Sequence, residues 1–292
     1  MNSIELKTSE ITCKIGDNTA DGEHNTLYNG IWDLRSIHEP INLFVPSYAG
    51  LNLEHIFDGS ATRGDNKRFF EPRHHPMELN MENGTATLHQ TPTPYMKVES
   101  WTSFRVEEPN RIRFQFRARP THTDFRFNYL GFFWASYILA PENKSIYFPT
   151  PENNERGWRW YQHCTLAHNR DSSVLSEKDD FQPTREDEKE MTLYAACSPV
   201  RYARPFYFGL RGKMVLIYIF EKADGLLRLC HSPSGGGPTP DKMDTCPAWD
   251  FIQFIRNPEA GRTYELSLTA VYKLYEGRSD VIRQVEAILG PQ

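Results

Sequence analysis

The feature that most constrains the fold of this chain is a period-two alternation of apolar and polar residues in three long segments. The segments are residues 95–109, 111–119 and 263–275. The predicted buried faces carry Ile112, Phe114 and Phe116 in the second segment, and Tyr264, Leu266, Leu268 and Ala270 in the third. This pattern predicts antiparallel strands with one face in a core and the other exposed.

Two further segments complete the expected fold. Residues 213–222 are almost continuously apolar, which predicts a strand covered on both faces, and Asp224 and Gly225 offer a turn just after it. Residues 279–289 predict a helix with Ser279 as its cap and a stripe of Val281, Val285 and Ile288. We therefore expect an all-β protein, a single large antiparallel β-sandwich domain over residues 1–292 with a short C-terminal helix.

Four long polar connections are expected between the strands. They are residues 16–46, 59–79, 169–189 and 232–247. The third is heavily charged and reads as a solvated surface excursion, and the fourth contains a Gly/Pro-rich stretch that reads as a hinge or flap. Loops of this length in a compact domain usually carry function or are disordered.

Composition narrows the class of protein. A net charge of -5, 13% aromatic residues and a mean hydropathy of -0.61 describe a soluble globular chain. Lysine and arginine form no dense run, so we expect no nucleic-acid partner, and no apolar run is long enough to cross a membrane. The N-terminus lacks the basic start and apolar core of a signal peptide, which predicts a cytoplasmic protein.

The five cysteines are odd in number, far apart and without a CxxC pair. This spacing argues against a disulfide framework and against a structural zinc site. Free thiols in a reducing compartment are the expected state.

The densest group of titratable side chains lies between Gly50 and Leu79, in GLNLEHIFDG and FEPRHHPMEL. Its members are Glu54, His55, Asp58, Arg73, His74, His75 and Glu78. An imidazole beside a carboxylate can act as a general acid, a general base or a metal ligand. Neighbouring residues of a strand point to opposite faces, so Glu54 and His55 should diverge, as should His74 and His75. The alternative is that these groups only cap and connect loops, with Arg73 and Glu78 paired at the surface.

A second group lies in GWRWYQHC, residues 157–164. Alternation would place Trp158 and Trp160 on one face, and Arg159, Tyr161 and His163 on the other. Sugars present an apolar face and a rim of hydroxyls, so aromatic platforms beside polar groups suit them. The alternative is that the tryptophans fill the core and the polar face is solvated.

The same imidazoles and carboxylates could assemble a metal site. His55, His74 or His75, and His163, with Glu54 or Glu78, would supply nitrogen and oxygen ligands and leave a position open for substrate. No HExxH or other tight ligand spacing is present. A divalent cation is thus an open alternative, and no other cofactor is expected.

Two stretches carry a family resemblance, TATLHQTPTPYMKVESWTSFRVEEPNRIRFQFRARPT and CPAWDFIQFIRNPEAGRTYELSLTAVYKLY. Over roughly Gly84 to Tyr275 the chain resembles the galactose mutarotase-like supersandwich proteins, which include aldose epimerases and domains of glycoside hydrolases and polysaccharide lyases. The resemblance implies a mid-chain histidine, followed by proline and an aromatic residue, as general acid and a late glutamate as general base. Here the segment nearest the histidine is LGFFWASY, with Trp134 in place of the imidazole, and Asp250 in PAWDF lies near the late carboxylate.

We expect a carbohydrate-active protein, acting as an epimerase, lyase or hydrolase by His/carboxylate acid-base chemistry. A non-catalytic carbohydrate-binding module of the same fold is the alternative, and a structural member of an assembly is a third. The candidate catalytic residues are His55, His75, His163 and Glu78. The candidate substrate-binding residues are Glu54, Arg73, His74, Trp134, Arg159, Tyr161, Trp249 and Asp250. The expected partner is a sugar or oligosaccharide, and the oligomeric state is left open.

Overall fold

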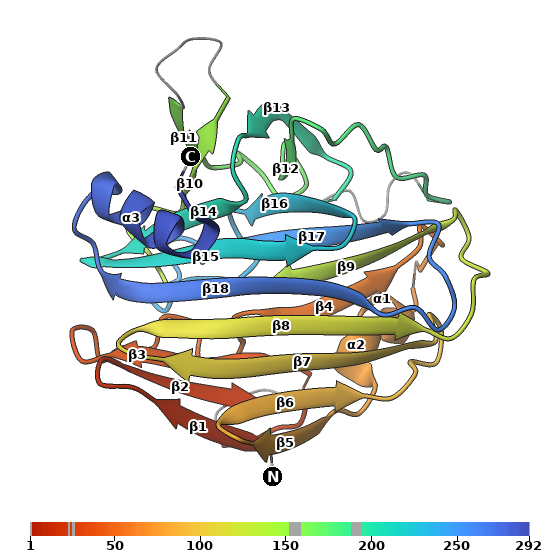
Figure 1. The fold of residues 1–292 in the computed structure, drawn as a ribbon, viewed down its shortest axis with the longest axis horizontal. Helices are drawn as coiled ribbons and strands as arrows, with labels where there is room; N and C mark the ends of the chain where they lie inside the picture. The colour runs from red at the N-terminus through yellow and green to blue at the C-terminus, as the bar shows by residue number, and fades with distance from the viewer. Residues whose placement is uncertain are drawn as a thin grey trace.

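The computed structural model describes residues 2–22, 24, 27–62, 64–151, 159–187 and 194–291. Within these ranges the strands form two large sheets, one behind the other, and a small third sheet (Figure 1). Neighbouring strands in the sheets are antiparallel, except for the parallel pair β12 and β13. The predicted all-β sandwich with a short C-terminal helix is confirmed.

The largest sheet has nine strands in the described part of the chain. In spatial order they are β11 (Arg159–His163), β10 (Ile146–Thr150), β14 (Phe206–Arg211), β15 (Met214–Ala223), β18 (Tyr264–Leu274), β8 (Arg111–Pro120), β7 (Val98–Glu107), β6 (Thr85–Gln90) and β5 (Glu78–Glu82). The second sheet has six described strands, β13 (Cys197–Tyr202), β12 (Ser173–Ser176), β16 (Leu226–Ser232), β17 (Ala248–Arg256), β9 (Tyr129–Ala135) and β4 (Asn52–Phe57). The small sheet consists of β1 (Ser3–Lys7), β2 (Ile11–Gly16) and β3 (Gly30–Ser36).

The apolar core lies between the two large sheets and extends to the small one. The predicted inward faces of β8 and β18 are confirmed, because every second residue of these strands is buried there. The prediction for β15 is also confirmed. One of its faces joins this core, while Val215, Ile217 and Ile219 pack on the other side against a helix.

That helix is α3 (Arg278–Leu289), which lies over β14 and β15 (Figure 1). Its predicted stripe is confirmed, since Val281 and Val285 are buried against the sheet. The predicted cap was wrong: the cap position is Gly277, at φ +93°, and Ser279 lies inside the first turn. None of the helices in the described ranges is long and apolar enough to cross a lipid bilayer.

Two of the expected connections contain strands. Residues 16–46 include β3, whose Ile31, Trp32 and Leu34 are buried, and residues 169–189 include β12. The charged connection is therefore not a purely solvated excursion, and Asp179 within it is buried. Residues 59–79 contain two short helices, α1 (Asn66–Phe69) and α2 (Glu71–His74), before β5 begins. The polar composition of these connections did not predict the strands and helices within them, because each of these elements is short and flanked by turns.

All five cysteines are unpaired thiols, as predicted. Cys13 and Cys230 lie in the interior, and burial raises the pKa of both thiols well above its usual value. A buried thiol that stays protonated is a poor nucleophile, so these two serve as packing groups.

Candidate active site

A β-bulge in β4 brings Glu54 and His55 to the same cavity. The pairing of β4 with β9 shifts between Leu53 and His55, so Glu54 is the extra residue of the bulged strand. Leu53 and Ile56 on either side enter the core, while Glu54 and His55 both line the cavity on the outer side of the six-stranded sheet. The expected divergence of Glu54 and His55 was therefore wrong, because it assumed an unbroken alternation.

Arg73 closes a buried network around Glu54. Its Nη2 lies 3.2 Å from Glu54 Oε1 and donates to Tyr137 Oη at 2.5 Å, and the Tyr137 hydroxyl donates to Glu54 Oε2 at 2.7 Å. The guanidinium also lies over the Tyr28 ring, 4.2 Å from its centroid. The arginine thus pairs with Glu54 and not with Glu78, and these contacts fix the carboxylate in one orientation.

The environment of Glu54 keeps it ionised. Burial by itself would raise the pKa of its carboxyl group, but the charge of Arg73 and hydrogen bonds from His55 and Tyr137 lower it to about 2. The His55 ring completes this side, with Nδ1 donating to the Phe69 carbonyl at 2.6 Å and Nε2 lying 3.4 Å from Glu54 Oε1. Glu54 therefore supplies a fixed negative charge at one end of the cavity.

The lowered pKa predicts an acid-sensitive contribution to stability. The folded-state pKa of about 2 lies below the ordinary value of 4.5, so the ion pair stabilises the fold above pH 4.5 and ceases to do so as the pH falls through 2. The shift corresponds to about 3 kcal/mol. We expect Glu54→Gln to be less stable than the wild type by about that amount at neutral pH, with the difference shrinking toward pH 2.

Urea unfolding at a series of pH values measures this difference. Glu78→Gln is the matched control, because Glu78 is an exposed carboxylate on the edge strand β5. A stability gap for Glu54→Gln that stays constant from pH 7 to pH 2 would contradict the assignment.

Aromatic side chains form one wall of the cavity. Phe69 and Phe70, at the junction of α1 and α2, and Phe133 of β9 all contact the His55 ring. The two helices are held in place by polar contacts: Asp65 caps α1, and Glu71 accepts a hydrogen bond from the backbone N–H of Met96. This wall offers the apolar surface on which one face of a sugar ring can lie.

Asp250 of β17 lines the same cavity and is the second carboxyl group of the site. Its Oδ1 accepts a hydrogen bond from the backbone N–H of Ser136 at 3.1 Å. Burial, followed by the nearby charge of Glu54, raises the pKa of Asp250 well above its ordinary value of 3.8. One cavity therefore holds a carboxyl group whose pKa is lowered and another whose pKa is raised, and such opposite shifts separate acid and base roles.

His168 also lines the cavity, and no sequence pattern singled it out. Its Nδ1 lies 2.7 Å from Ser232 Oγ, and partial burial lowers the pKa of the imidazole, which favours the neutral ring. Among the described residues, Nε2 has no hydrogen-bond partner. The residue stands in a loop between β11 and β12, where no periodic pattern identified it. Tyr137, which follows β9, was missed for the same reason.

The cavity has a volume of about 200 Å³. Its lining also includes Ala135, Asn169, Tyr194 and Gly235. Pockets for drug-sized ligands are typically larger, from about 300 Å³ upward. The site is therefore sized for one small molecule, such as a single sugar ring.

The structure brings together Glu54, His55, Arg73 and Asp250 of the sequence-predicted residues, and places the others elsewhere. Trp134 and Trp249 lie in the core between the sheets, and His74, His75 and Glu78 lie near the protein surface, with His75 Nε2 on Thr91 Oγ1 at 2.9 Å. Arg159 and Tyr161 are exposed on the edge strand β11. Trp158 lies outside the described residues.

His163 is buried away from this cavity. Its ring lies 5.9 Å from that of His231, and burial lowers the pKa of His163 to about 4. Among the described residues, no hydrogen-bond partner reaches its buried Nε2. His163 is not among the residues that line the cavity with Glu54, Asp250 and His168.

No metal cluster is evident in the described part of the chain, where no three or more His, Cys, Asp or Glu side chains are grouped to hold an ion. In the candidate site, Glu54 is already engaged by Arg73 and Tyr137, and burial raises the pKa of Asp250, which disfavours its deprotonated form. Metal ligands must be deprotonated. The donor set therefore does not fit a divalent cation.

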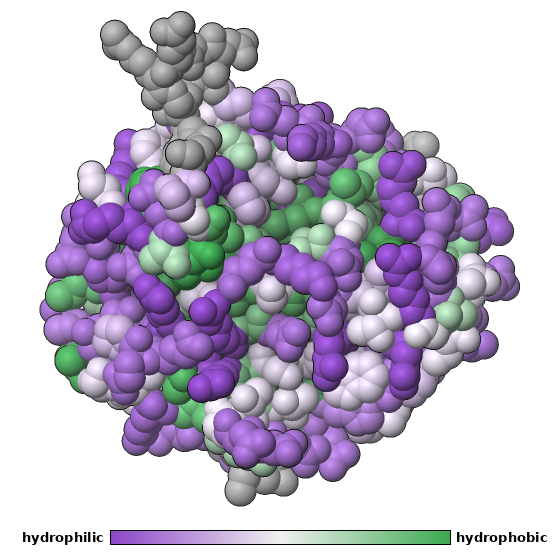
Figure 2. Space-filling view, in the orientation of Figure 1, coloured by the Kyte–Doolittle hydropathy of each residue, from purple (hydrophilic) through white to green (hydrophobic). Residues whose placement is uncertain are grey.

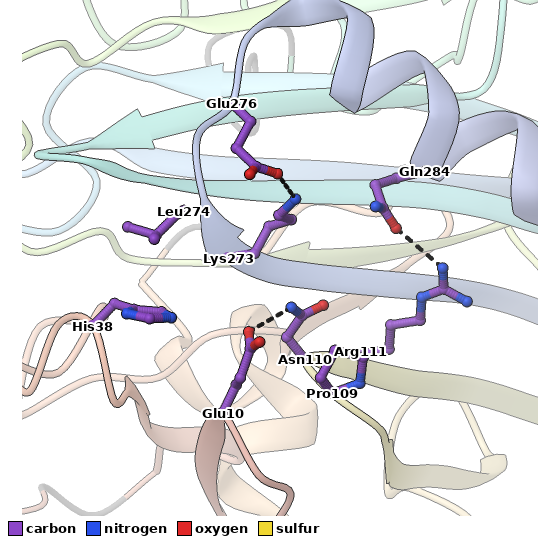
Figure 3. A pocket seen from close by; sticks show the side chains of 9 residues that line it. All are labelled: Glu10, His38, Pro109, Asn110, Arg111, Lys273, Leu274, Glu276 and Gln284. Carbon is purple, nitrogen blue, oxygen red and sulfur yellow. Dashed lines mark hydrogen bonds and ion pairs between the residues drawn. The ribbon is translucent and has the colours of Figure 1, made fainter.

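A larger cavity of about 410 Å³ opens on another side of the molecule (Figure 3). The polar side chains that line it bind one another: Lys273 pairs with Glu276, Arg111 donates to Gln284, and Asn110 donates to Glu10. No aromatic side chain lines it among the described residues apart from the imidazole of His38. It lacks the combination of platform and opposed carboxyl groups found beside Asp250.

Comparisons with solved structures identify the architecture. The Slr1438 protein from Synechocystis sp. PCC 6803 superimposes with a TM-score of 0.53 at 9% identity, over 94% of this chain and 96% of that one. A putative aldose 1-epimerase from Escherichia coli K12 gives a TM-score of 0.53 at 8% identity, over 94% and 99%. The chain has the galactose mutarotase-like fold.

This mutarotase-like fold confirms the resemblance inferred from the strand pattern. No protein-family model matches the sequence, and comparison with curated protein sequences finds no match. At such low identity the likeness concerns the fold alone. The chemistry must therefore be argued from the cavity, because one fold can carry many activities.

Proposed function

We propose that the protein is a carbohydrate-active enzyme that interconverts the anomers of a small sugar in the cavity of Glu54, His168 and Asp250. The observation that carries this proposal is one cavity that brings together Glu54, whose pKa is lowered, Asp250, whose pKa is raised, and the imidazole of His168, whose pKa is lowered. Acid-base catalysis needs a donor and an acceptor that are both ready at the working pH. The aldose epimerase-like fold and the aromatic wall support a sugar as substrate.

Asp250 and His168 supply the two proton transfers that the reaction needs. His168 Nε2 takes the proton of the anomeric hydroxyl, while the neutral Asp250 gives a proton to the ring oxygen. The bond between the anomeric carbon and the ring oxygen breaks, and the anomeric carbon becomes the carbonyl carbon of the open-chain aldose. After rotation about the neighbouring carbon–carbon bond, the same steps run in reverse, and both residues regain their starting protonation.

Glu54 sets the electrostatics of both partners without transferring a proton. Its negative charge raises the pKa of Asp250 and favours the imidazolium form of His168 that appears during ring opening. Arg73 and Tyr137 hold this charge in place. Asp250 here takes the acid role that the epimerase resemblance assigns to a mid-chain histidine, and His168 is followed by asparagine and not by proline.

The pH dependence of anomer interconversion tests this assignment. His168 must be neutral, and its pKa is lowered, so the rate should fall on the acidic side below pH 6.5. Asp250 must be protonated, and its pKa is raised, so the alkaline fall should come at a pH well above 3.8. Polarimetry of freshly dissolved D-glucose and D-galactose at a series of pH values measures the profile, and His168→Gln should abolish the acidic limb.

A non-catalytic sugar-binding protein gives a different result in the same experiments. Calorimetry would then detect sugar binding, while polarimetry would show no acceleration by the wild type at any pH. An acceleration that keeps its acidic limb in His168→Gln would contradict the role of this imidazole.

A further inference from the structure

The loop between β11 and β12 brings His168 to the cavity and has little apolar support of its own. Residues 166–171 are all exposed, and none of them belongs to an apolar cluster of the described chain. The loop ends at β12, on the upper edge of the molecule in Figure 1, and Figure 2 shows mainly hydrophilic residues along that edge. Polar contacts therefore have to fix the path of this loop.

Both ends of the loop are bound to His231 of β16. At its start, the backbone N–H of Thr165 donates to His231 Nδ1 at 3.3 Å. At its end, the carbonyl of Ser172 accepts a hydrogen bond from the backbone N–H of His231 at 3.0 Å. All three residues are buried. The exposed residues between Thr165 and Ser172 thus project from one buried point of attachment.

The environment of His231 fixes the tautomer that the contact with Thr165 needs. Its Nε2 lies 2.8 Å from the Lys144 carbonyl, which can only accept, so Nε2 carries the hydrogen. The Trp249 indole donates to the same carbonyl at 2.8 Å and holds it in place. Burial lowers the pKa of His231 to about 4, which favours the neutral ring. In that ring Nδ1 has a free lone pair and accepts the Thr165 N–H.

Ser232, the next residue of β16, contacts the His168 ring directly. Neighbouring residues of a strand face opposite sides, so Ser232 lines the cavity, while His231 lies opposite Trp249 of the core. Ser232 Oγ lies 2.7 Å from His168 Nδ1. When Nδ1 donates its hydrogen to this oxygen, His168 Nε2 keeps the lone pair that a proton acceptor needs.

We propose that His231 and Ser232 are positioning residues, of which His231 holds the loop at the cavity and Ser232 fixes the His168 ring with Nε2 free to accept a proton. This inference rests on the function proposed above for His168 and adds the residues that hold its imidazole in place. A displacement of about 1 Å can lower a rate by about a hundredfold. Loss of either contact should therefore slow proton transfer while Asp250 and Glu54 stay in place.

Two substitutions of His231 separate its two side-chain contacts. An asparagine amide extends about as far as Nδ1 and can still accept the Thr165 N–H, whereas a glutamine amide extends about as far as Nε2 and can keep only the contact with Lys144. We expect His231→Gln and Ser232→Ala to lower the rate of anomer interconversion by about tenfold or more, and His231→Asn to lose much less. Ser279→Ala is the control for Ser232→Ala, because Ser279 is exposed in α3, and it should keep the wild-type rate.

The same substitutions in the His168→Gln background distinguish positioning from a general loss of structure. There His231→Gln and Ser232→Ala should lower the remaining rate no further, because both act through His168. Hydrogen exchange followed by mass spectrometry is the second readout. Peptides that cover residues 165–172 should exchange faster in His231→Gln than in His231→Asn, while peptides of β15 should exchange equally in the two variants.

Three results would each overturn the proposal: equal losses of rate with and without His168, equal rates of His231→Gln and His231→Asn, or equal exchange of the loop in these two variants. If the wild-type protein accelerates no anomer interconversion, the function proposed above fails. The exchange measurement then still decides whether His231 holds the loop.

Discussion

Asp250→Asn is expected to lower kcat for anomer interconversion by about 10² to 10⁴-fold, with little change in KM. An amide cannot deliver an acidic proton to the ring oxygen, whereas a carboxyl group whose pKa is raised by burial can. The amide oxygen can still accept the hydrogen bond from the Ser136 N–H that now holds Oδ1. Polarimetric progress curves over a range of sugar concentrations separate kcat from KM.

Asp124→Asn is the control for this substitution, since Asp124 is exposed in the β8–β9 connection and makes no side-chain hydrogen bond among the described residues. It should retain wild-type kinetics. If Asp250→Asn keeps kcat within a few-fold of the wild type while binding sugar, Asp250 is not the proton donor. Equal stability of the two variants in urea would exclude unfolding as the cause of lost activity.

The fold was largely predictable because the long strands have one solvent-exposed face and one buried face. In β8 the alternation of arginine or glutamine with Ile112, Phe114 and Phe116 fixes which side faces the core. The strands of the site lack this signal. In β9 and β17 nearly every residue is buried, since one face meets the core and the other meets the loops around the cavity.

This double burial explains which site residues were mistaken. Trp134 and Trp249 were candidate substrate-binding residues, but their side chains lie in the core, and the neighbouring Phe133 and Asp250 line the cavity. The bulge at Glu54 is also invisible to a period-two pattern, because one extra residue changes the face of everything before it. Glu54, His55 and Arg73 were candidates because of their residue types and their proximity in the sequence. Asp250 was a candidate because of the family resemblance, while His168 needed the three-dimensional path of its loop.

Arg228→Met is expected to lower the free energy of unfolding by about 3 to 5 kcal/mol. Arg228 and Asp179 both have 0% side-chain exposure, with Nε to Oδ2 at 2.7 Å and Nη2 to Oδ1 at 3.0 Å. The guanidinium also donates to the carbonyl oxygens of Tyr194, at 3.1 Å, and Phe181. Removing the cation leaves the Asp179 carboxylate buried and uncompensated, and leaves two carbonyls without this donor.

The double variant Arg228→Met/Asp179→Leu separates the cost of the uncompensated carboxylate from the cost of the lost hydrogen bonds to the two carbonyls. It removes the carboxylate and should therefore recover part of the lost stability. Arg256→Met is the control: its exposed guanidinium lies 5.6 Å from the Phe181 centroid, and its loss should cost less than about 1 kcal/mol. Chemical unfolding monitored by tryptophan fluorescence measures all three, and equal stability of Arg228→Met and Arg256→Met would contradict the expectation.

Because Tyr194 lines the cavity and is held by Arg228, the folded fraction of Arg228→Met should also bind sugar more weakly. Through Arg228, the buried Asp179 thus supports both the stability of the fold and the position of Tyr194 at the site.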